Sequence, residues 1–159
     1  MKKDMDKDIT LREATEEDLP VLWELEQGVI AAERPFDPTI RPDPVHYYDL
    51  PALMASPLAT VVVACAGTQI VASGFAQEKR ARPYLDHTTY AYLGFMYTVP
   101  QWRGKGINGL VLEHIKAWAA QRGLTELRLT VYEGNEAAIR AYAKAGLKKH
   151  IAEMRLSLV

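Results

Sequence analysis

Residues 97–109 read Tyr-Thr-Val-Pro-Gln-Trp-Arg-Gly-Lys-Gly-Ile-Asn-Gly, and this stretch decides both the fold and the chemistry expected of the chain. Aromatic and β-branched residues before Pro100 predict the end of a strand, and apolar spacing over residues 107–122 predicts a helix. Between them, glycines allow an anion to approach the backbone, and the first turn of a helix offers unpaired N–H groups. The corner therefore predicts a phosphate or diphosphate site, to which Arg103 and Lys105 add positive charge.

The residues of this corner leave other interpretations open. The glycines could form only a tight turn beside solvated Arg103 and Lys105, although the strand–turn–helix context favours an anion site. Gly104, Gly106 and Gly109 also spell G-x-G-x-x-G, the dinucleotide fingerprint, so a nucleotide-dependent oxidoreductase is an alternative. It is less favoured because the chain ends too soon after Gly109 for repeated βαβ units. A Walker-type phosphate loop is excluded because the sequence lacks G-x-x-x-x-G-K-[ST].

Apolar periodicity along the rest of the chain predicts an α/β (α+β) fold with about four helices and a sheet of about six to seven strands. A strand, a helix and a strand follow one another over residues 88–131, which requires a crossover and hence one parallel pair in a mostly antiparallel, twisted sheet. The strands are expected at residues 9–14, 60–65, 69–79, 88–99 and 127–131, with one or two more from Leu147 onward, and the helices at 18–32, 45–55, 107–122 and 135–145.

Single residues add local expectations. Asp18 is expected to be a helix N-cap, and Pro51 is expected to interrupt the helix at 45–55. Gly94 inside a strand predicts a bulge or a close backbone approach. Cys65 lies in an apolar strand, which indicates a buried, inert thiol. The inner face of the helix at 107–122 is expected to carry Ile107, Leu110, Val111, His114, Ile115 and Trp118.

Composition narrows the class of protein. The chain has 159 residues and a formal net charge of −1, which argues against a basic nucleic-acid footprint or a polybasic membrane anchor. One cysteine cannot form an internal disulfide, and no stretch is apolar enough to span a bilayer, so the expected location is cytoplasmic. The four histidines are scattered, so no metal site is expected. Residues 1–8 are expected to be flexible, followed by a single domain at 9–159.

Two motifs resemble those of a known family. Gln101-x-x-Gly104-x-Gly106 resembles the Q/R-x-x-G-x-G/A acetyl-CoA signature of the Gcn5-related N-acetyltransferases (GNAT). A second motif follows downstream, Asn135-x-x-Ala138-x-x-x-Tyr142-x-x-x-Gly146-Leu147. Leu147 replaces the aromatic residue common after the final glycine, a mild change in packing. The resemblance covers nearly the whole chain and implies the three-layer GNAT fold.

The resemblance implies an acetyl-CoA-dependent N-acetyltransferase that moves acetyl directly to a primary amine of a small molecule, or of a peptide or protein N-terminus, and releases coenzyme A. It implies that Tyr142 stands beside the thioester sulfur as general acid, and that the Met96 N–H donates to the developing oxyanion. The cofactor-binding residues it implies are Met96, Tyr97, Thr98, Arg103, Gly104, Lys105, Gly106, Ile107, Asn108, Gly109 and Asn135.

The residues of the second motif also have plainer interpretations. Asn135 and Tyr142 are seven residues apart and so lie on one helix face, within reach of one ligand. By sequence alone, Asn135 is equally well explained as a helix N-cap. Tyr142 by itself is better explained as a core aromatic residue with its hydroxyl at the rim, and only the resemblance reverses that preference.

The acceptor side is expected to be formed by the first helix and the Pro-rich loop, with Glu33 and Tyr47 as the substrate residues. Its acidic and aromatic residues suit a small amine or a peptide N-terminus. The candidates for the general base are Glu33, Glu78, His87 and Tyr97, and a chain of ordered waters could serve instead. A non-catalytic acyl-CoA-binding or regulatory module is the main alternative function. Exposed sheet edges are compatible with a homodimer, although no sequence feature decides it.

Overall fold

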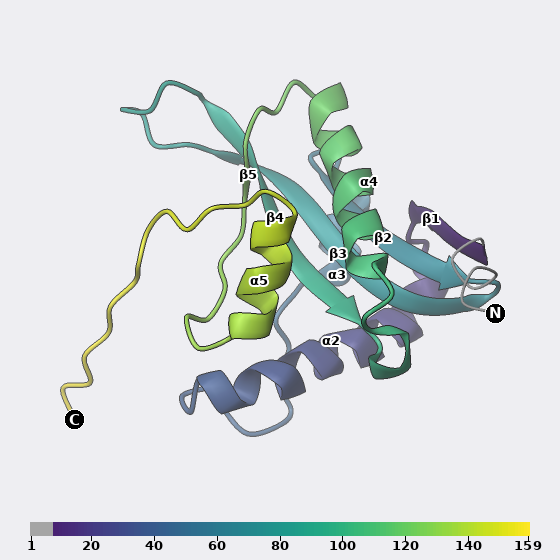
Figure 1. The fold of residues 1–159 in the computed structure, drawn as a ribbon, viewed down its shortest axis with the longest axis horizontal. Helices are drawn as coiled ribbons and strands as arrows, with labels where there is room; N and C mark the ends of the chain where they lie inside the picture. The colour runs from purple at the N-terminus through teal and green to yellow at the C-terminus, as the bar shows by residue number, and fades with distance from the viewer. Residues whose placement is uncertain (1–7) are drawn as a thin grey trace.

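The computed structural model describes residues 8–159, and the predicted flexible segment lies outside the described residues except for Asp8. One twisted sheet forms the centre of the molecule (Figure 1). Its strand order is β1-β2-β3-β4-β5, antiparallel throughout except for the parallel pair β4–β5, which confirms the predicted crossover. The strands are β1 (Ile9–Glu13), β2 (Ala59–Ala66), β3 (Gln69–Arg80), β4 (Thr89–Thr98) and β5 (Leu127–Arg128).

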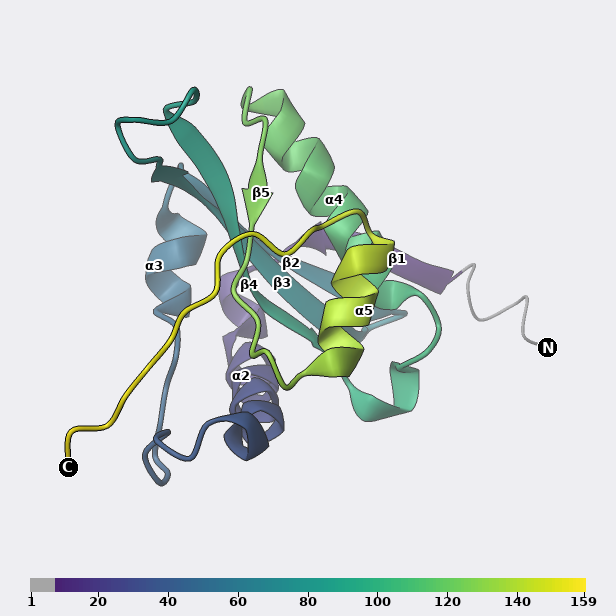
Figure 2. The same ribbon diagram turned by 60° about the vertical axis from the view of Figure 1, so that its left-hand side comes forward.

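Among the described residues, four α-helices cover the two faces of the sheet, so the fold has three layers, as expected (Figure 2). One face carries α2 (Leu19–Glu33) and α3 (Leu50–Ala55), and the other carries α4 (Ile107–Gln121) and α5 (Glu136–Lys144). Short 3-10 turns precede or follow these helices at η2 (Glu16–Asp18), η3 (Arg34–Phe36) and η4 (Pro100–Trp102). Among residues 8–159, no helix is long and apolar enough to cross a membrane.

In the described part of the chain, a large apolar cluster lies on each face of the sheet, and Ala91, Ala119 and Leu124 form a small third cluster. Strand β2 is buried along nearly its whole length and contributes to both clusters, as its run of β-branched residues predicted. The Cys65 thiol lies in this strand and is free and buried, which confirms the expectation. The two central strands, β2 and β3, are therefore the rigid frame against which β4 and both helical layers are positioned.

The sheet has five strands among the described residues, so the prediction of six to seven strands is wrong. The missing strands belong to residues 147–159, which form no helix or strand here. Their apolar side chains alternate as in a strand, which is why the sequence predicted one. In the structure this segment runs away from the sheet and its large apolar side chains are exposed (Figure 1). A strand needs a neighbouring strand for its backbone hydrogen bonds, and residues 147–159 pair with no strand of the described residues.

Three local predictions also need correction. Pro51 does not interrupt a helix, because α3 begins at Leu50 and the proline occupies its first turn, where a missing N–H costs nothing. Leu110 is 42% exposed, and the buried face of α4 is turned toward Leu112 and Ala119 instead. Asp18 precedes α2 as predicted, but its side chain does not cap that helix.

The Asp18 carboxylate instead holds the turn before α2 to the first strand. Arg12 donates to it through Nη1 at 2.7 Å, and the Thr15 N–H donates to it at 2.8 Å. The hydrogen bond from Arg12 lowers the pKa of Asp18 to about 2. The folded state favours the charged carboxylate, so the pair adds to the free energy of unfolding. This contribution is complete above the pKa that Asp has in the unfolded state, about 4, and it is lost as the pH falls toward about 2.

Replacing Asp18 by Asn is therefore expected to reduce stability most at neutral pH. We expect a loss of about 1–2 kcal/mol in the free energy of unfolding, since the exposed Arg12 side chain limits the strength of the pair. Urea denaturation at a series of pH values measures the effect. The free energy of unfolding of the variant should approach that of the parent protein at low pH. A difference between the two that stays constant at all pH values would contradict this role for Asp18.

Candidate functional site

A bulge near the end of β4 shapes the site. The register between β3 and β4 shifts between Ser73 and Phe75, as Gly94 predicted, and Phe95 adopts a φ of 57°, which is unusual for a residue with a side chain. Two side chains hold the Phe95 backbone in place. The buried Ser73 Oγ donates to its carbonyl at 2.9 Å, and its N–H donates to the Tyr48 hydroxyl at 3.3 Å.

The bulge reverses which residues of β4 face the open side of the sheet. Before it, the Ala91 N–H points toward β5 and donates to the Glu126 carbonyl. After it, the Val99 N–H donates to Val71 of β3, so Met96 and Thr98 face away from β3. Strand β5 pairs with β4 only at Ala91 and Tyr92. The backbone groups of Met96 and Thr98 therefore lie along an edge of β4 that β5 does not cover.

The glycine corner begins where this open edge ends. Gly104 and Gly106 have φ values of 76° and 79°, which favour glycine, and a Cβ built on either would meet no atom within 4 Å. Gly106 is the N-cap of α4 and, within residues 8–159, no side chain caps that helix. The first N–H groups of α4 therefore have no side-chain acceptor among the described residues, and the glycines keep the corner free of side chains, an arrangement that fits a diphosphate.

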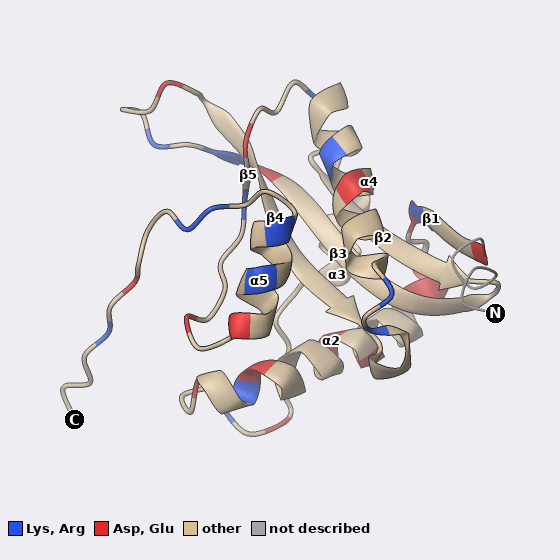
Figure 3. Cartoon of the chain, in the orientation of Figure 1, with Lys and Arg blue, Asp and Glu red and all other residues tan. Residues whose placement is uncertain are grey.

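Basic residues flank the glycine corner (Figure 3). The Arg103 Nε donates to the Thr98 carbonyl at 2.9 Å, and its guanidinium lies 5.4 Å from the centre of the Tyr97 ring. The Lys105 Nζ lies 4.6 Å from the centre of the Trp102 ring. Both side chains are thus held beside the corner by backbone or aromatic contacts, and their charges complement an anion there.

The two residues of the second motif lie on α5, as predicted. The Asn135 Oδ1 accepts from the Ala138 N–H at 3.3 Å, so Asn135 is the N-cap of this helix, and its side-chain amide group remains available as a donor. Tyr142 is partly buried against the apolar cluster that contains α4. Burial raises the pKa of Tyr142 to about 12, and the charge of Glu33 contributes to this rise. Its hydroxyl is therefore protonated at neutral pH.

Glu33, at the end of α2, lies on the same side of the molecule as a group of tyrosines. Burial raises the pKa of its carboxyl, and neither a hydrogen bond nor a positive charge from the described residues offsets the effect. Burial also raises the pKa of Tyr47, with the charge of Glu33 as the next cause. The charge of Glu33 thus contributes to the raised pKa of both Tyr47 and Tyr142, which places its carboxyl within electrostatic range of a predicted acceptor residue and of the predicted general acid.

Sequence reasoning missed Tyr132, which belongs to this group. Its hydroxyl donates to the Asp37 Oδ2 at 3.0 Å, and its ring stacks on Phe36. Burial and the bond to Asp37 raise the pKa of Tyr132 to about 12. Tyr132 directly follows the strand predicted at 127–131. Its position at the end of that strand is the signal in the sequence that could have indicated a site residue.

The loop that carries Tyr47 and Tyr48 is held by Glu26, a buried carboxylate that the sequence analysis did not single out. Its oxygens accept from the Tyr47 and Tyr48 N–H groups at 3.1 and 2.9 Å and lie 2.7 Å from the His46 Nδ1. A fully buried carboxylate needs such partners to offset its desolvation. Glu26 thus fixes the acceptor loop to α2, and through Tyr48 it supports the bulge in β4.

The other candidates for the general base lie elsewhere. His87 is at the far end of β4, in a cluster with Glu126 and Arg128 near the start of β5. Glu78 is opposite Ala91, on the other side of the bulge from Met96. The Tyr97 ring packs against α2 where Gly28 leaves room for it. Of the four candidates, only Glu33 is among the causes that raise the pKa of Tyr142.

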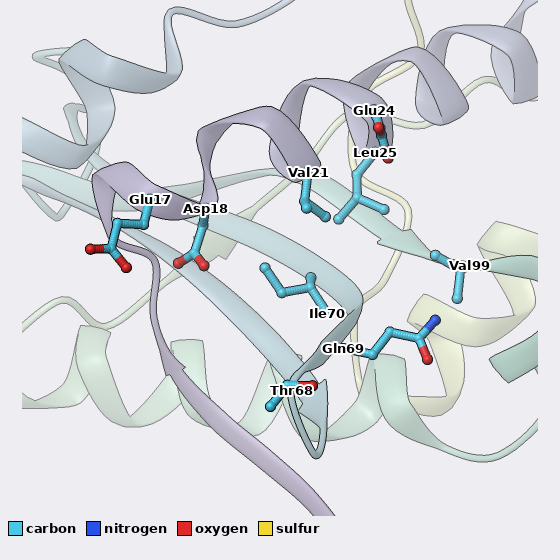
Figure 4. Close-up of a pocket in the computed structure, with 9 residues that line it drawn as sticks. All are labelled: Glu17, Asp18, Val21, Glu24, Leu25, Thr68, Gln69, Ile70 and Val99. Atoms are coloured by element: carbon cyan, nitrogen blue, oxygen red, sulfur yellow. The ribbon is translucent and has the colours of Figure 1, made fainter.

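A cavity of about 370 Å³ lies between the start of α2 and the β2–β3 turn, close to the end of β4 (Figure 4). Glu17, Asp18 and Glu24 contribute its charges, and Val99 lines its inner end. This negative lining disfavours a phosphate-bearing ligand, so the cavity does not compete with the glycine corner as an anion site. None of the residues predicted for cofactor or acceptor binding lines it.

Comparison with known proteins gives consistent matches. The sequence model described as "Acetyltransferase (GNAT) family" matches residues 16–147. A curated aminoglycoside N(6')-acetyltransferase type 1 from Stenotrophomonas maltophilia is 28% identical over 122 residues, which cover 74% of this chain and 72% of that protein.

Solved structures match the fold as well. A tetramutant of the BH1408 protein from Bacillus halodurans has a TM-score of 0.84 at 23% identity, and the match covers 94% of this chain and 99% of the other. A predicted acetyltransferase from Clostridium acetobutylicum, solved with acetyl-CoA, has a TM-score of 0.74 at 22% identity, and the match covers 94% and 96% of the two chains. At these identities the two structures bear on the fold alone.

Proposed function

Because the chain belongs to the acetyltransferase (GNAT) family, we propose that it transfers an acetyl group from acetyl-CoA directly to a primary amine, within one ternary complex. The observation that carries this proposal is the continuity of the open edge of β4 with the glycine corner. An extended ligand arm can pair with the edge as an added strand would, and the diphosphate attached to it then meets the N-terminus of α4.

The donor, when bound, supplies an activated thioester. Along β4, the backbone groups of Met96 and the N–H of Thr98 hydrogen-bond the pantetheine arm, and Tyr97 between them orients this segment by packing on α2. The side-chain amide of Asn135 reaches the same arm from α5. The diphosphate is held by the corner, which consists of Arg103, Gly104, Lys105, Gly106, Ile107, Asn108 and Gly109. Because these groups are fixed by secondary structure, they position the thioester with little loss of entropy on binding.

Two groups act at the reacting atoms. The Met96 N–H faces the open edge and donates to the thioester carbonyl oxygen as negative charge develops on it. The Tyr142 hydroxyl, kept protonated by its raised pKa, donates a proton to the departing sulfur. The acceptor must attack as a neutral amine, so a carboxylate on the acceptor side assists by receiving its proton.

We assign that acceptor role to Glu33, with Tyr47 beside it. A partly buried carboxylate among tyrosines attracts a cationic amine and can take up one proton from it. The curated relative carries the name of an aminoglycoside acetyltransferase, and an aminoglycoside is a small molecule with several amino groups. This supports a small, cationic amine as the acceptor rather than an anionic compound.

Replacing Glu33 by Gln tests the acceptor site. We expect the KM for the amine to rise roughly 10-fold, as for the loss of one charged hydrogen bond, with the Kd for acetyl-CoA unchanged. In the parent protein, kcat/KM should fall as the pH drops through the raised pKa of Glu33, and this limb should disappear in the variant. Steady-state kinetics between mildly acidic and neutral pH measure both effects.

A stability measurement serves as the control for this variant. The raised pKa means that the folded state binds the Glu33 proton more tightly than the unfolded state, so the charged carboxylate costs stability above its unfolded-state pKa. The Gln variant should therefore unfold at the same temperature as the parent protein or a higher one. An unchanged KM for every amine that the enzyme accepts would contradict the assignment of Glu33.

A transfer assay tests the function itself. The purified protein is incubated with acetyl-CoA and a panel of amines that includes aminoglycosides, polyamines and short peptides, and thiol release is followed together with the mass of each amine. We expect an acetylated product of at least one cationic small amine. Binding of acetyl-CoA without transfer to any amine would instead indicate the non-catalytic acyl-CoA-binding module.

A further inference from the structure

One peptide of β4, between Phe95 and Met96, follows a residue in a conformation that its side chain does not favour. Phe95 has a φ of 57°, a region in which a Cβ is crowded and which bulges usually fill with glycine. Its ring is buried, and its centre lies 5.3 Å from that of the Tyr48 ring. Backbone strain of this kind persists only where the surroundings hold it, and it is concentrated at functional sites.

The Ser73 hydroxyl holds this peptide from the neighbouring strand, β3. Its Oγ donates to the Phe95 carbonyl at 2.9 Å, and Ser73 is only 1% exposed. The Phe95 carbonyl and the Met96 N–H belong to one planar trans peptide, in which the two groups point in opposite directions. Holding the carbonyl toward Ser73 therefore directs the Met96 N–H away from β3, toward the open edge of β4.

Packing alone does not explain a hydroxyl at this position. Residues 70–76 of β3 are all buried, and Ser73 is the one residue among them with a polar side chain. An alanine would fill nearly the same space and would bring no hydroxyl to desolvate. A donor on the carbonyl also polarises the peptide, which makes the N–H at its other end a stronger donor. The hydroxyl therefore both aims and strengthens the Met96 N–H.

Further contacts fix the residues on either side of this peptide. A Cβ built on Gly74, opposite the bulge, would lie 2.7 Å from the Met96 Sδ and 2.8 Å from a methyl carbon of α4. The glycine thus leaves room for the Met96 side chain between β3 and α4. On the other side, the Phe95 N–H donates to the Tyr48 hydroxyl at 3.3 Å. With both neighbours held, the remaining freedom is rotation of the peptide itself, which the Ser73 hydroxyl opposes.

We propose that Ser73 is a positioning residue for acetyl transfer and acts through the Phe95–Met96 peptide. The proposal rests on the function proposed above, in which the Met96 N–H donates to the thioester oxygen as negative charge develops on it. Ser73 does not touch the thioester itself. Its hydroxyl keeps the donor in the orientation that the transition state requires, and a donor fixed in advance needs no reorganisation during the reaction.

Replacing Ser73 by Ala removes the hydroxyl and leaves the bulge in place. We expect kcat to fall about 10-fold, less than for the complete loss of an oxyanion donor, because the Met96 N–H is still present but is no longer aimed. The Kd for acetyl-CoA and the KM for the amine should change less than about 2-fold, since the interaction is made mainly in the transition state. Steady-state kinetics and calorimetry measure this split.

Two further variants serve as comparisons. Thr60 lies in β2, is 3% exposed and donates to the Glu13 Oε1 at 3.2 Å, so Thr60→Val also removes a buried hydroxyl, but away from the bulge. Its kcat should equal that of the parent protein, although both variants are expected to unfold at a lower temperature. Ser73→Cys has nearly the same shape and a weaker donor, so its kcat should lie between those of the parent and Ser73→Ala. It carries the test if the Ala variant does not fold.

Infrared spectroscopy of bound acetyl-CoA, isotopically labelled at the thioester carbonyl carbon, tests the aim of the donor directly. An N–H that donates to the carbonyl oxygen weakens the C=O bond. The carbonyl band should therefore move to lower frequency on binding to the parent protein and to Thr60→Val, and should move less in Ser73→Ala. A parental kcat in the folded Ser73 variant, or a parental band position, overturns the role of Ser73 and leaves acetyl transfer standing. Absence of both binding and transfer in the parent protein overturns the proposed function as well.

Discussion

Replacing Gly106 by Asp is expected to weaken the binding of acetyl-CoA roughly 100-fold, because a carboxylate is brought within a few ångströms of the diphosphate. Gly106 is the N-cap of α4 and has a φ of 79°, a conformation that Asp and Asn tolerate better than other residues with side chains. The Cβ itself meets open space, so the substitution does not displace the surrounding chain. The expected loss is therefore one of binding, and isothermal titration calorimetry measures it.

Gly106→Asn is the matched control. Its side chain has the same shape and meets the same backbone strain, but it carries no charge. We expect a loss of affinity of about 10-fold or less, attributable to strain and crowding at the corner. The difference between the two variants isolates the electrostatic repulsion of the diphosphate. Equal affinities of the Asp and Asn variants for acetyl-CoA would show that the diphosphate does not bind at this helix end.

Replacing Tyr142 by Phe is expected to lower kcat roughly 100-fold or more, the usual effect of losing a general acid. The Kd for acetyl-CoA should change little, because the ring remains packed against the α4 side of the sheet. Since the pKa of Tyr142 is raised to about 12, its ionisation should leave the pH profile flat through the neutral range. Pre-steady-state measurement of thiol release separates this chemical step from product release.

Tyr90→Phe provides the comparison for that variant. Tyr90 lies near the start of β4, where its ring contacts Arg128 well away from the bulge, so loss of its hydroxyl should leave kcat unchanged. If Tyr142→Phe retains the turnover of the parent protein, Tyr142 is not the proton donor. The sulfur then departs with another donor or as the thiolate, and the role of Tyr142 is reduced to packing.

Sequence patterns predicted the elements that depend on local chemistry. The alternation and β-branching of residues 59–80 predicted the hairpin of β2 and β3. The apolar spacing before Gly123 predicted the helix at 107–121. Gly94 correctly predicted an irregularity in β4, because the register shifts beside it and the Phe75 ring occupies the space where its Cβ would lie. The glycine corner was also predictable, since positive φ values and an uncapped helix end require the residues found there.

Features that depend on long-range contacts were not predictable. The position of Tyr132 beside Asp37 joins residues far apart in the sequence, and so does the support that Glu26 gives to Tyr47 and Tyr48. The rotation of α4 that exposes Leu110 depends on the shape of the sheet beneath it. The segment after Leu147 has the alternating pattern of a strand, but it forms none in the structure, because a strand also needs a neighbouring strand that the pattern cannot reveal.

We propose that the corner at Gly104–Gly106 binds the diphosphate of coenzyme A, and the function proposed for this chain depends on it. The most direct test is calorimetry of the parent protein with acetyl-CoA and, in parallel, with S-acetylpantetheine, which has the same thioester arm but lacks the diphosphate. We expect acetyl-CoA to bind at least roughly 100-fold more tightly, about 3 kcal/mol in binding free energy. Equal affinity for the two compounds, or no heat of binding with acetyl-CoA at millimolar concentration, would contradict the account.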